Sequence, residues 1–299
     1  MKTAIATAVS VIALTALAGP ALAKEPKVEI RNAVARVSVV IEDRADVAVE
    51  VEHGASSLPR VQVSRRGDEV IIDGGLGNRR SGLFNRGGGD RIRQCHTGRE
   101  GGLPGEGAWV EVRDMGRVNV MDAPVILVRV PRNVDVEAEG AIFGSIGRGA
   151  SAVELGHGGC GRWDVSNVDG PVSLAIGGSG DIRTGTSRAL EVSIGGSGSV
   201  MAGATRGLEV AIGGSGDVRV ARLDGPMEVS IGGSGDVDVR SGTSPNIDIS
   251  VAGSGDINFG GVAHDVDVSI VGSGDVTIAR ATGSVSRAIL GGGDVRIGD

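Results

Sequence analysis

The sequence predicts an all-β protein, a single-stranded parallel β-helix or solenoid of about nine coils of ~19 residues with a β-rich N-terminal cap. Three observations lead to this fold class. A short motif repeats at a nearly constant step, apolar residues alternate on both sides of it, and the composition is rich in glycine and poor in aromatic residues.

The clearest copy of the motif runs from Ile231 to Val239, I-G-G-S-G-D-V-D-V. The slot after Ser-Gly or Gly-Gly recurs at steps of 18, 18, 19, 20, 19 and 19 residues, which is typical of a solenoid. Its occupants are Asp181, Ser199, Asp217, Asp236, Asp256, Asp275 and Asp294. Two weaker copies upstream place Asp164 17 residues before Asp181 and Ser145 a further 19 back, so nine coils are expected.

Each copy predicts a strand, a turn and a second strand. Val229 and Ile231 alternate with polar residues before the glycines, and Val237 and Val239 do so after the aspartate, so each run buries one face. Glycine permits the turn. Such short strands cannot bury a face alone and become stable by stacking in parallel at ~4.8 Å. We expect right-handed winding, because the step drifts between 17 and 20 residues and left-handed solenoids usually keep strict hexapeptides.

The composition fits a thin solenoid. The chain has 53 Gly, no Tyr, three Phe and two Trp, so the corners are supplied with glycine and few rings need space inside.

Residues 1–23 have the pattern of a secretory signal peptide. Lys2 precedes an apolar run from Ala4 to Leu17, and Ala21-Leu22-Ala23 forms a small-residue cleavage site. The apolar run is shorter than a ~20-residue membrane span, so we expect export without a transmembrane segment in the mature chain. Without Lys2 the chain has 29 basic and 37 acidic side chains, a formal charge of −8, which disfavours nucleic acid as a partner.

Residues 24–139 are expected to form the β-rich N-terminal part, and residues 140–299 the repetitive β-helix. The N-terminal part is either a separate small sheet or a set of irregular first coils that cap the solenoid, and we favour the cap because an open coil end would expose unpaired backbone. Within the first part, residues 74–107 form an insert rich in glycine and arginine. It is either a solvated flexible loop or a basic loop that binds phosphate or acidic sugar. Its arginines are Arg79, Arg80, Arg86, Arg91, Arg93 and Arg99.

The two cysteines, Cys95 and Cys160, predict a disulfide that joins the insert to an early coil of an exported protein. A zinc site built from Cys95, His96, His157 and Cys160 is the alternative, although adjacent Cys and His chelate poorly.

A column of like charges is expected where the aspartates superimpose, because neighbouring coils are ~5 Å apart. Calcium bound to stacked carboxylates is one way to offset the repulsion. The sequence departs from calcium-binding repeats, in which the motif G-G-x-G-x-D spans nine residues. The other way is for each carboxylate to accept backbone N–H groups in its own turn. The candidate column comprises Asp217, Asp236, Asp256, Asp275 and Asp294.

No catalytic motif of the G-x-S-x-G, H-E-x-x-H or P-loop kind occurs, and no Asp, Lys, Arg or His cluster interrupts the repeat. We therefore expect neither catalytic residues nor a cofactor. A polysaccharide lyase or hydrolase is the alternative, and it requires carboxylates that converge in a groove on one face.

The V-x-I-x-G-S-G-D-[VI] units resemble the bacterial autotransporter-adhesin head domains of the GIN type, specifically over residues 140–299. Val34-Ala-Arg-Val-Ser-Val-Val and Val70-Ile-Ile-Asp-Gly look like that family's leading strands. The resemblance implies a parallel β-helix, a periplasmic or extracellular address and no established enzymatic activity, and it defines no ligand residues.

Together these features predict a non-enzymatic exported module that binds an envelope polysaccharide or protein. The alternatives are the polysaccharide-active enzyme and a passive periplasmic scaffold whose coil ends associate between molecules, which sedimentation would detect as oligomers.

Overall fold

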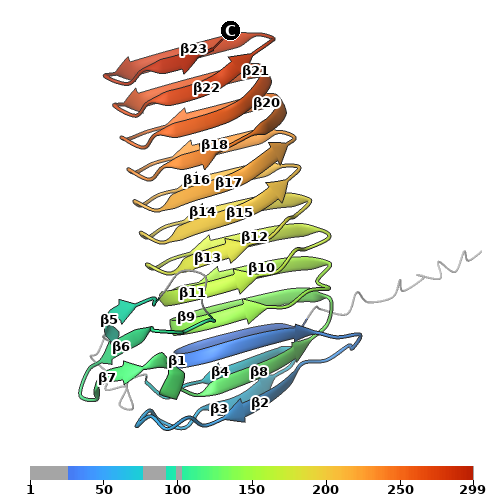
Figure 1. Ribbon diagram of the computed structural model, residues 1–299, viewed down its shortest axis with the longest axis vertical. Helices are drawn as coiled ribbons and strands as arrows, with labels where there is room; N and C mark the ends of the chain where they lie inside the picture. The colour runs from blue at the N-terminus through green and yellow to red at the C-terminus, as the bar shows by residue number, and fades with distance from the viewer. Residues whose placement is uncertain (1–25, 77–91, 99–102, 299) are drawn as a thin grey trace, which may run out of the picture.

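The structure is a computed structural model and describes residues 26–76, 92–98 and 103–298. The predicted signal peptide, residues 1–23, and five arginines of the insert lie outside the described residues. In the described part the fold is an all-β, parallel β-solenoid of about nine turns at ~19-residue spacing, joined to an N-terminal sheet region, as predicted (Figure 1). The sense of winding stays a prediction.

Two stacks of parallel strands form the long faces of the solenoid, and we name them by their outward residues. The glutamate face contains, from the cap upward, β4 (Glu69–Asp73), β1 (Lys27–Ile41), β9 (Asn133–Ile146), β10 (Ala152–His157), β12 (Pro171–Ile176), β14 (Ala189–Ile194), β16 (Leu208–Ile212), β18 (Met227–Ile231), β20 (Gly242–Val251), β21 (Ile257–Gly272) and β23 (Val285–Gly291). The aspartate face contains β8 (Val125–Val130), the second halves of β1 and β9, β11 (Cys160–Val165), β13 (Asp181–Thr184), β15 (Ser199–Thr205), β17 (Asp217–Asp224), β19 (Val237–Val239), the first part of β21, β22 (Val276–Ala281) and β24 (Val295–Ile297).

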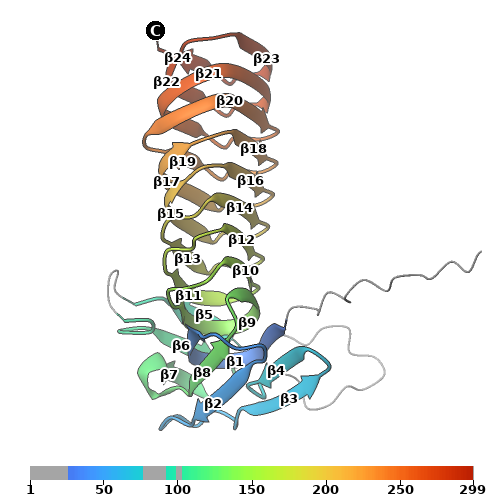
Figure 2. The ribbon, with the colours of Figure 1, turned by 90° about the vertical axis from the view of Figure 1, so that its right-hand side faces the viewer.

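The N-terminal strands continue the same solenoid in a different order along the chain. β1 is a whole coil that pairs with β9 above it and with β4 and β8 below it (Figure 1). β2 (Ala48–Glu52) pairs antiparallel with β8, and β3 (Gln62–Arg66) pairs antiparallel with β4, so both edges of the lowest coil are covered (Figure 2). These strands form the expected cap, since an uncovered coil would expose unpaired backbone.

A separate three-stranded antiparallel sheet packs on the outside of the lowest coils. It consists of β5 (Ile92–His96), β6 (Trp109–Val112) and β7 (Gly116–Asn119), followed by the short helix η1 (Val120–Asp122). Its buried Val110 and Val112 share a second apolar core with Val34 and Phe143 of the solenoid wall. Within residues 74–107, the described part includes β5, whose Ile92 and Cys95 pack against this second core.

The main core fills the inside of the solenoid. Inward and outward residues alternate strictly along strands such as β14, so valine, isoleucine and leucine stack in columns. Trp163 is fully buried in one column, directly above Gly144, whose missing side chain leaves the space that the indole ring occupies. Rings thus fit in this narrow interior only where a neighbouring coil supplies glycine.

Candidate functional site

The slot of the repeat forms one outward column on the aspartate face. From Asp181 upward its members are those predicted. Asp181, Ser199 and Asp217 pair in register, and the other members each directly precede a paired strand residue: Asp236, Asp256, Asp275 and Asp294. Below Asp181 the prediction was wrong by two residues, because Asp181 lies in register with Arg162, and Arg162 with Phe143. Asp164 and Ser145 belong to the adjacent outward column. The motif changes here because the second apolar core covers Phe143, where a carboxylate would lose its hydration.

Four carboxylates in the column each accept a backbone N–H from the coil above, whereas Asp294 accepts the N–H of Val295 in its own turn. The Oδ1 atom of Asp217 accepts from Asp236 at 3.3 Å, that of Asp236 from Asp256 at 2.9 Å, that of Asp256 from Asp275 at 2.8 Å and that of Asp275 from Asp294 at 3.0 Å. The expectation that each carboxylate binds N–H groups of its own turn was therefore wrong for these four. Hydrogen bonds between coils give the charged column a structural role.

Two arginines neutralise part of this column. Arg219 lies 3.3 Å from Asp217, and Arg296 lies 3.2 Å from Asp275 and 3.0 Å from Asp294. Asp236 and Asp256 have no ion pair within the part of the chain that the structure describes. Ser199 is uncharged in the same slot because its hydroxyl donates to Asp181 at 2.7 Å, a contact that a second carboxylate could not make.

A shallow groove of about 360 Å³ follows the column over the upper coils. Its walls combine carboxylates with donors from the adjacent outward column, in which Asn258 donates to Asp238 at 2.7 Å. The outward side chains that line the groove are Asp217, Arg219, Asp236, Asp238, Asp256, Asn258, Asp275, Thr277 and Arg296. Within the described residues, no group of three or more His, Cys, Asp or Glu side chains is arranged to hold a metal ion.

The opposite, glutamate face carries an acidic column that the sequence reasoning missed. Its members pair in register and point outward beside a second column of small residues. The signal was present in the repeats, where Leu190, Leu208, Met227, Ile247 and Val266 are each followed by an acidic residue. The acidic column above Ser173 comprises Glu191, Glu209, Glu228, Asp248 and Asp267.

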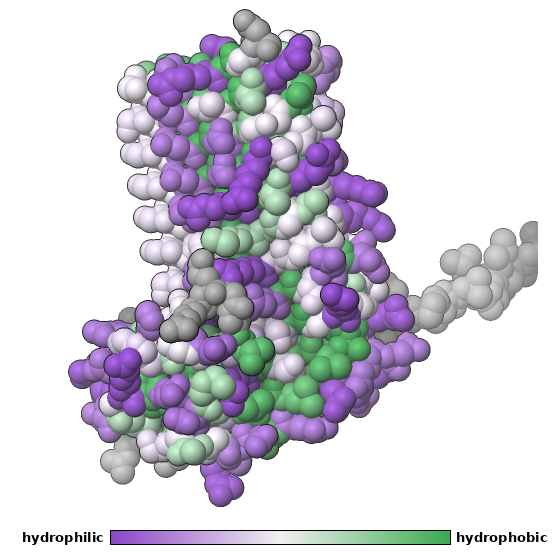
Figure 3. Space-filling model, viewed as in Figure 1, coloured by the Kyte–Doolittle hydropathy of each residue, from purple (hydrophilic) through white to green (hydrophobic). Residues whose placement is uncertain are grey.

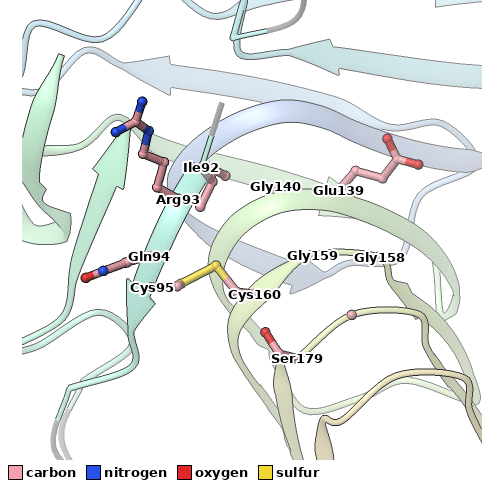
Figure 4. A pocket seen from close by; sticks show the side chains of 11 residues that line it. Ile92, Arg93, Gln94, Cys95, Glu139, Gly140, Gly158, Gly159, Cys160 and Ser179 are labelled. Carbon is pink, nitrogen blue, oxygen red and sulfur yellow. A yellow bond between two sulfur atoms is a disulfide. The ribbon is translucent and has the colours of Figure 1, made fainter. Parts of the chain in front are cut away.

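A second hollow, of about 400 Å³, lies where β5 meets the corner of the lower coils (Figure 4). Cys95 of β5 and Cys160 of β11 form the predicted disulfide across it. The zinc alternative was wrong, because the two sulfur atoms are bonded to each other and His157 is buried in the solenoid interior. Arg93 of β5 also lines the hollow, whereas Arg79, Arg80, Arg86, Arg91 and Arg99 lie outside the described residues.

The surface around these sites is mostly polar. In Figure 3 one edge of the solenoid is pale over its whole height, in keeping with the small, weakly polar residues of the Gly-Ser corners.

Trp109 on β6 stacks on His96 with ring centroids 5.7 Å apart, and the Arg117 guanidinium lies 3.9 Å from the Trp109 ring centroid. Across the described ranges, no helix has the length and apolar character needed to cross a membrane.

These features define a class, a parallel β-solenoid with repetitive polar faces. Residues 174–298 match the family model described as "Putative auto-transporter adhesin, head GIN domain", which confirms the resemblance seen in the repeats over that range. A solved structure described as a putative lipid binding protein from Parabacteroides distasonis is similar with a TM-score of 0.49 and 17% identity, over 92% of this chain and 93% of that chain. A search of curated proteins finds no match.

Proposed function

We propose that this protein is an exported, non-enzymatic binding module whose aspartate face holds a hydroxyl-rich polysaccharide of the envelope or cell exterior. The groove is the main evidence for this proposal, because each coil from Asp217 to Asp275 presents a carboxylate to solvent at the equivalent position. A polymer with a regular repeat can bind such a ladder through many weak contacts, and their effects combine into useful avidity.

Two further observations support the address and the class. The Cys95–Cys160 disulfide is typical of oxidising compartments outside the cytosol, and the matched family model describes an adhesin head domain. The signal-peptide pattern in residues 1–23 supports the same periplasmic or surface location.

A polysaccharide suits the groove better than a protein surface does. The outward side chains of the groove are carboxylates, arginines, an asparagine and a threonine, with no large apolar side chain among them. Protein interfaces usually need an apolar or aromatic centre, whereas sugar hydroxyls donate readily to carboxylates.

The proposal is tested with the mature protein on an array of neutral, amino-sugar and uronic-acid polysaccharides. We expect binding to neutral or amino-sugar polymers and weaker binding to uronic-acid polymers, because like charges repel. The double variant Asp236→Asn/Asp256→Asn should lose binding, and the matched variant Glu191→Gln/Glu209→Gln on the glutamate face should keep it. Binding to no polymer above background, or equal loss in both variants, would contradict the proposal.

A polysaccharide-active enzyme is the second candidate, because the same groove brings several carboxylates together on one face. Glycoside hydrolysis requires two carboxylates on either side of the scissile bond. Incubating the protein with any polymer that it binds, and measuring new reducing ends or unsaturated products, separates the two functions. Product that disappears in Asp236→Asn would identify an enzyme.

A further inference from the structure

The two ends of the solenoid are protected differently. At the lower end, β2 and β3 pair with the outer edges of β8 and β4. At the upper end, β23 and β24 pair only with β21 and β22 below them, and no strand within the described ranges covers their outer edges. All seven residues of β23 are exposed. An uncovered strand edge offers unpaired N–H and C=O groups to another chain.

Apolar exposure is concentrated at this open end. Of the eight large apolar side chains that are exposed among the described residues, five lie between Val262 and Leu290. Val285 and Ile289, with 39% and 43% of their surface exposed, continue the inward columns of Val266 and Ile270, which are 3% and 0% exposed. A further strand stacked on β23 would bury Val285 and Ile289 as each lower coil is buried by the next.

Between these two apolar residues, the inward column contains a charge. Arg287 lies in register with the fully buried Val268, and its guanidinium donates across the end of the solenoid to the Val295 carbonyl of β24 at 3.3 Å. An inward-pointing charge on an edge strand discourages pairing with any chain that leaves the charge without a partner. A second copy stacked here would bring a second Arg287 into the interior without a carboxylate, whereas an acidic residue in that place would pair with the guanidinium.

We propose that the open end formed by β23 and β24 binds an extended strand of a different protein as an additional rung. The strand would place apolar residues over Val285 and Ile289 and an acidic residue between them, facing Arg287. This inference concerns a different surface from the aspartate face and goes beyond the polysaccharide-binding function. Strand addition supplies backbone hydrogen bonds, and the Arg287 position supplies the selectivity.

The test uses three labelled nine-residue peptides that copy residues 264–272, the part of β21 directly below β23, with Glu, Val or Lys at the position of Val268. Fluorescence anisotropy with the mature protein should show the Glu peptide binding about tenfold or more tightly than the Lys peptide. The variant Arg287→Glu should reverse this order. Ile289→Lys should abolish binding, and Val63→Lys on β3 of the capped end should not change it.

Two outcomes would overturn the inference. One is that the wild-type protein does not bind the Glu peptide at about 1 mM, or binds all three peptides equally. Circular dichroism spectra that match the wild type show that the variants are folded. The other is sedimentation of the wild-type protein as a dimer that Ile289→Lys dissociates, since a second copy would then cover the end.

Discussion

His157 should make the solenoid less stable as the pH falls. Its imidazole is 1% exposed, and neither ring nitrogen has a hydrogen-bond partner among the described residues. Burial lowers the pKa of His157 from 6.5 to about 4. The backbone of Ala138 and the negative charge of Asp181 oppose part of this shift. Protons therefore bind the unfolded chain more readily than the folded one, so stability is complete above about pH 6.5 and declines below it.

The expected size follows from the two pKa values. The pKa of His157 is 6.5 in the unfolded chain and about 4 in the folded one. This difference lowers the free energy of unfolding by about 3 kcal/mol once the pH is below 4, and about 2 kcal/mol of that loss has occurred at pH 5. Urea unfolding at a series of pH values, for the wild type and for His157→Leu, isolates this contribution because the two proteins differ in no other titratable group.

Between pH 7.5 and 5, the wild type should lose about 2 kcal/mol more than His157→Leu. The absolute stability of the variant does not matter, since only the pH dependence is compared. The exposed His264 provides a control, and His264→Gln should behave as the wild type does. Parallel pH profiles for the wild type and His157→Leu would refute the reasoning.

Three other changes probe the packing, the disulfide and the charged column. Gly144→Ala should cost about 1–3 kcal/mol in urea unfolding, because the added methyl group overlaps the Trp163 ring, while Gly207→Ala, which meets nothing within 4 Å, should cost far less. Equal costs would contradict the packing argument. Cys95→Ser/Cys160→Ser should lower the free energy of unfolding by up to about 4 kcal/mol. It should also speed amide hydrogen exchange in β5 and β6 but not in β16. Unchanged exchange in β5 would contradict the idea that the disulfide tethers this strand. Asp256→Asn keeps the Oδ1 acceptor and removes one charge, so stability should rise by about 1 kcal/mol at low salt and the gain should vanish in about 1 M NaCl. A salt-independent change would contradict the column repulsion.

The repeat contains most of the information about the upper solenoid. The positions from Asp181 to Asp294 can be read directly, since each coil contacts only its neighbours and each must solve the same packing problem. The glutamate column was equally readable, because Glu191 and Glu209 recur at the same step as the aspartates.

The lower coils were less predictable for a physical reason. Phe143 and Arg162 replace aspartate where the sheet of β5 to β7 covers the outside of the solenoid. No local sequence pattern predicts that contact. The placement of β1 between β9 and the pair β4 and β8 depends on partners far along the chain. Periodicity indicates that these strands exist but does not specify which of them become neighbours.

The pairing of each upper coil with its two neighbours alone has a consequence for the reach of the molecule. Leu190 lies in register with Leu208, so excising residues 190–207 would join equivalent points of two successive turns. The shortened molecule would keep its base and its tip and lose only ~4.8 Å of height. Duplicating the same segment would extend it by as much, so gain or loss of single repeats can adjust how far the tip stands from its base without a new fold.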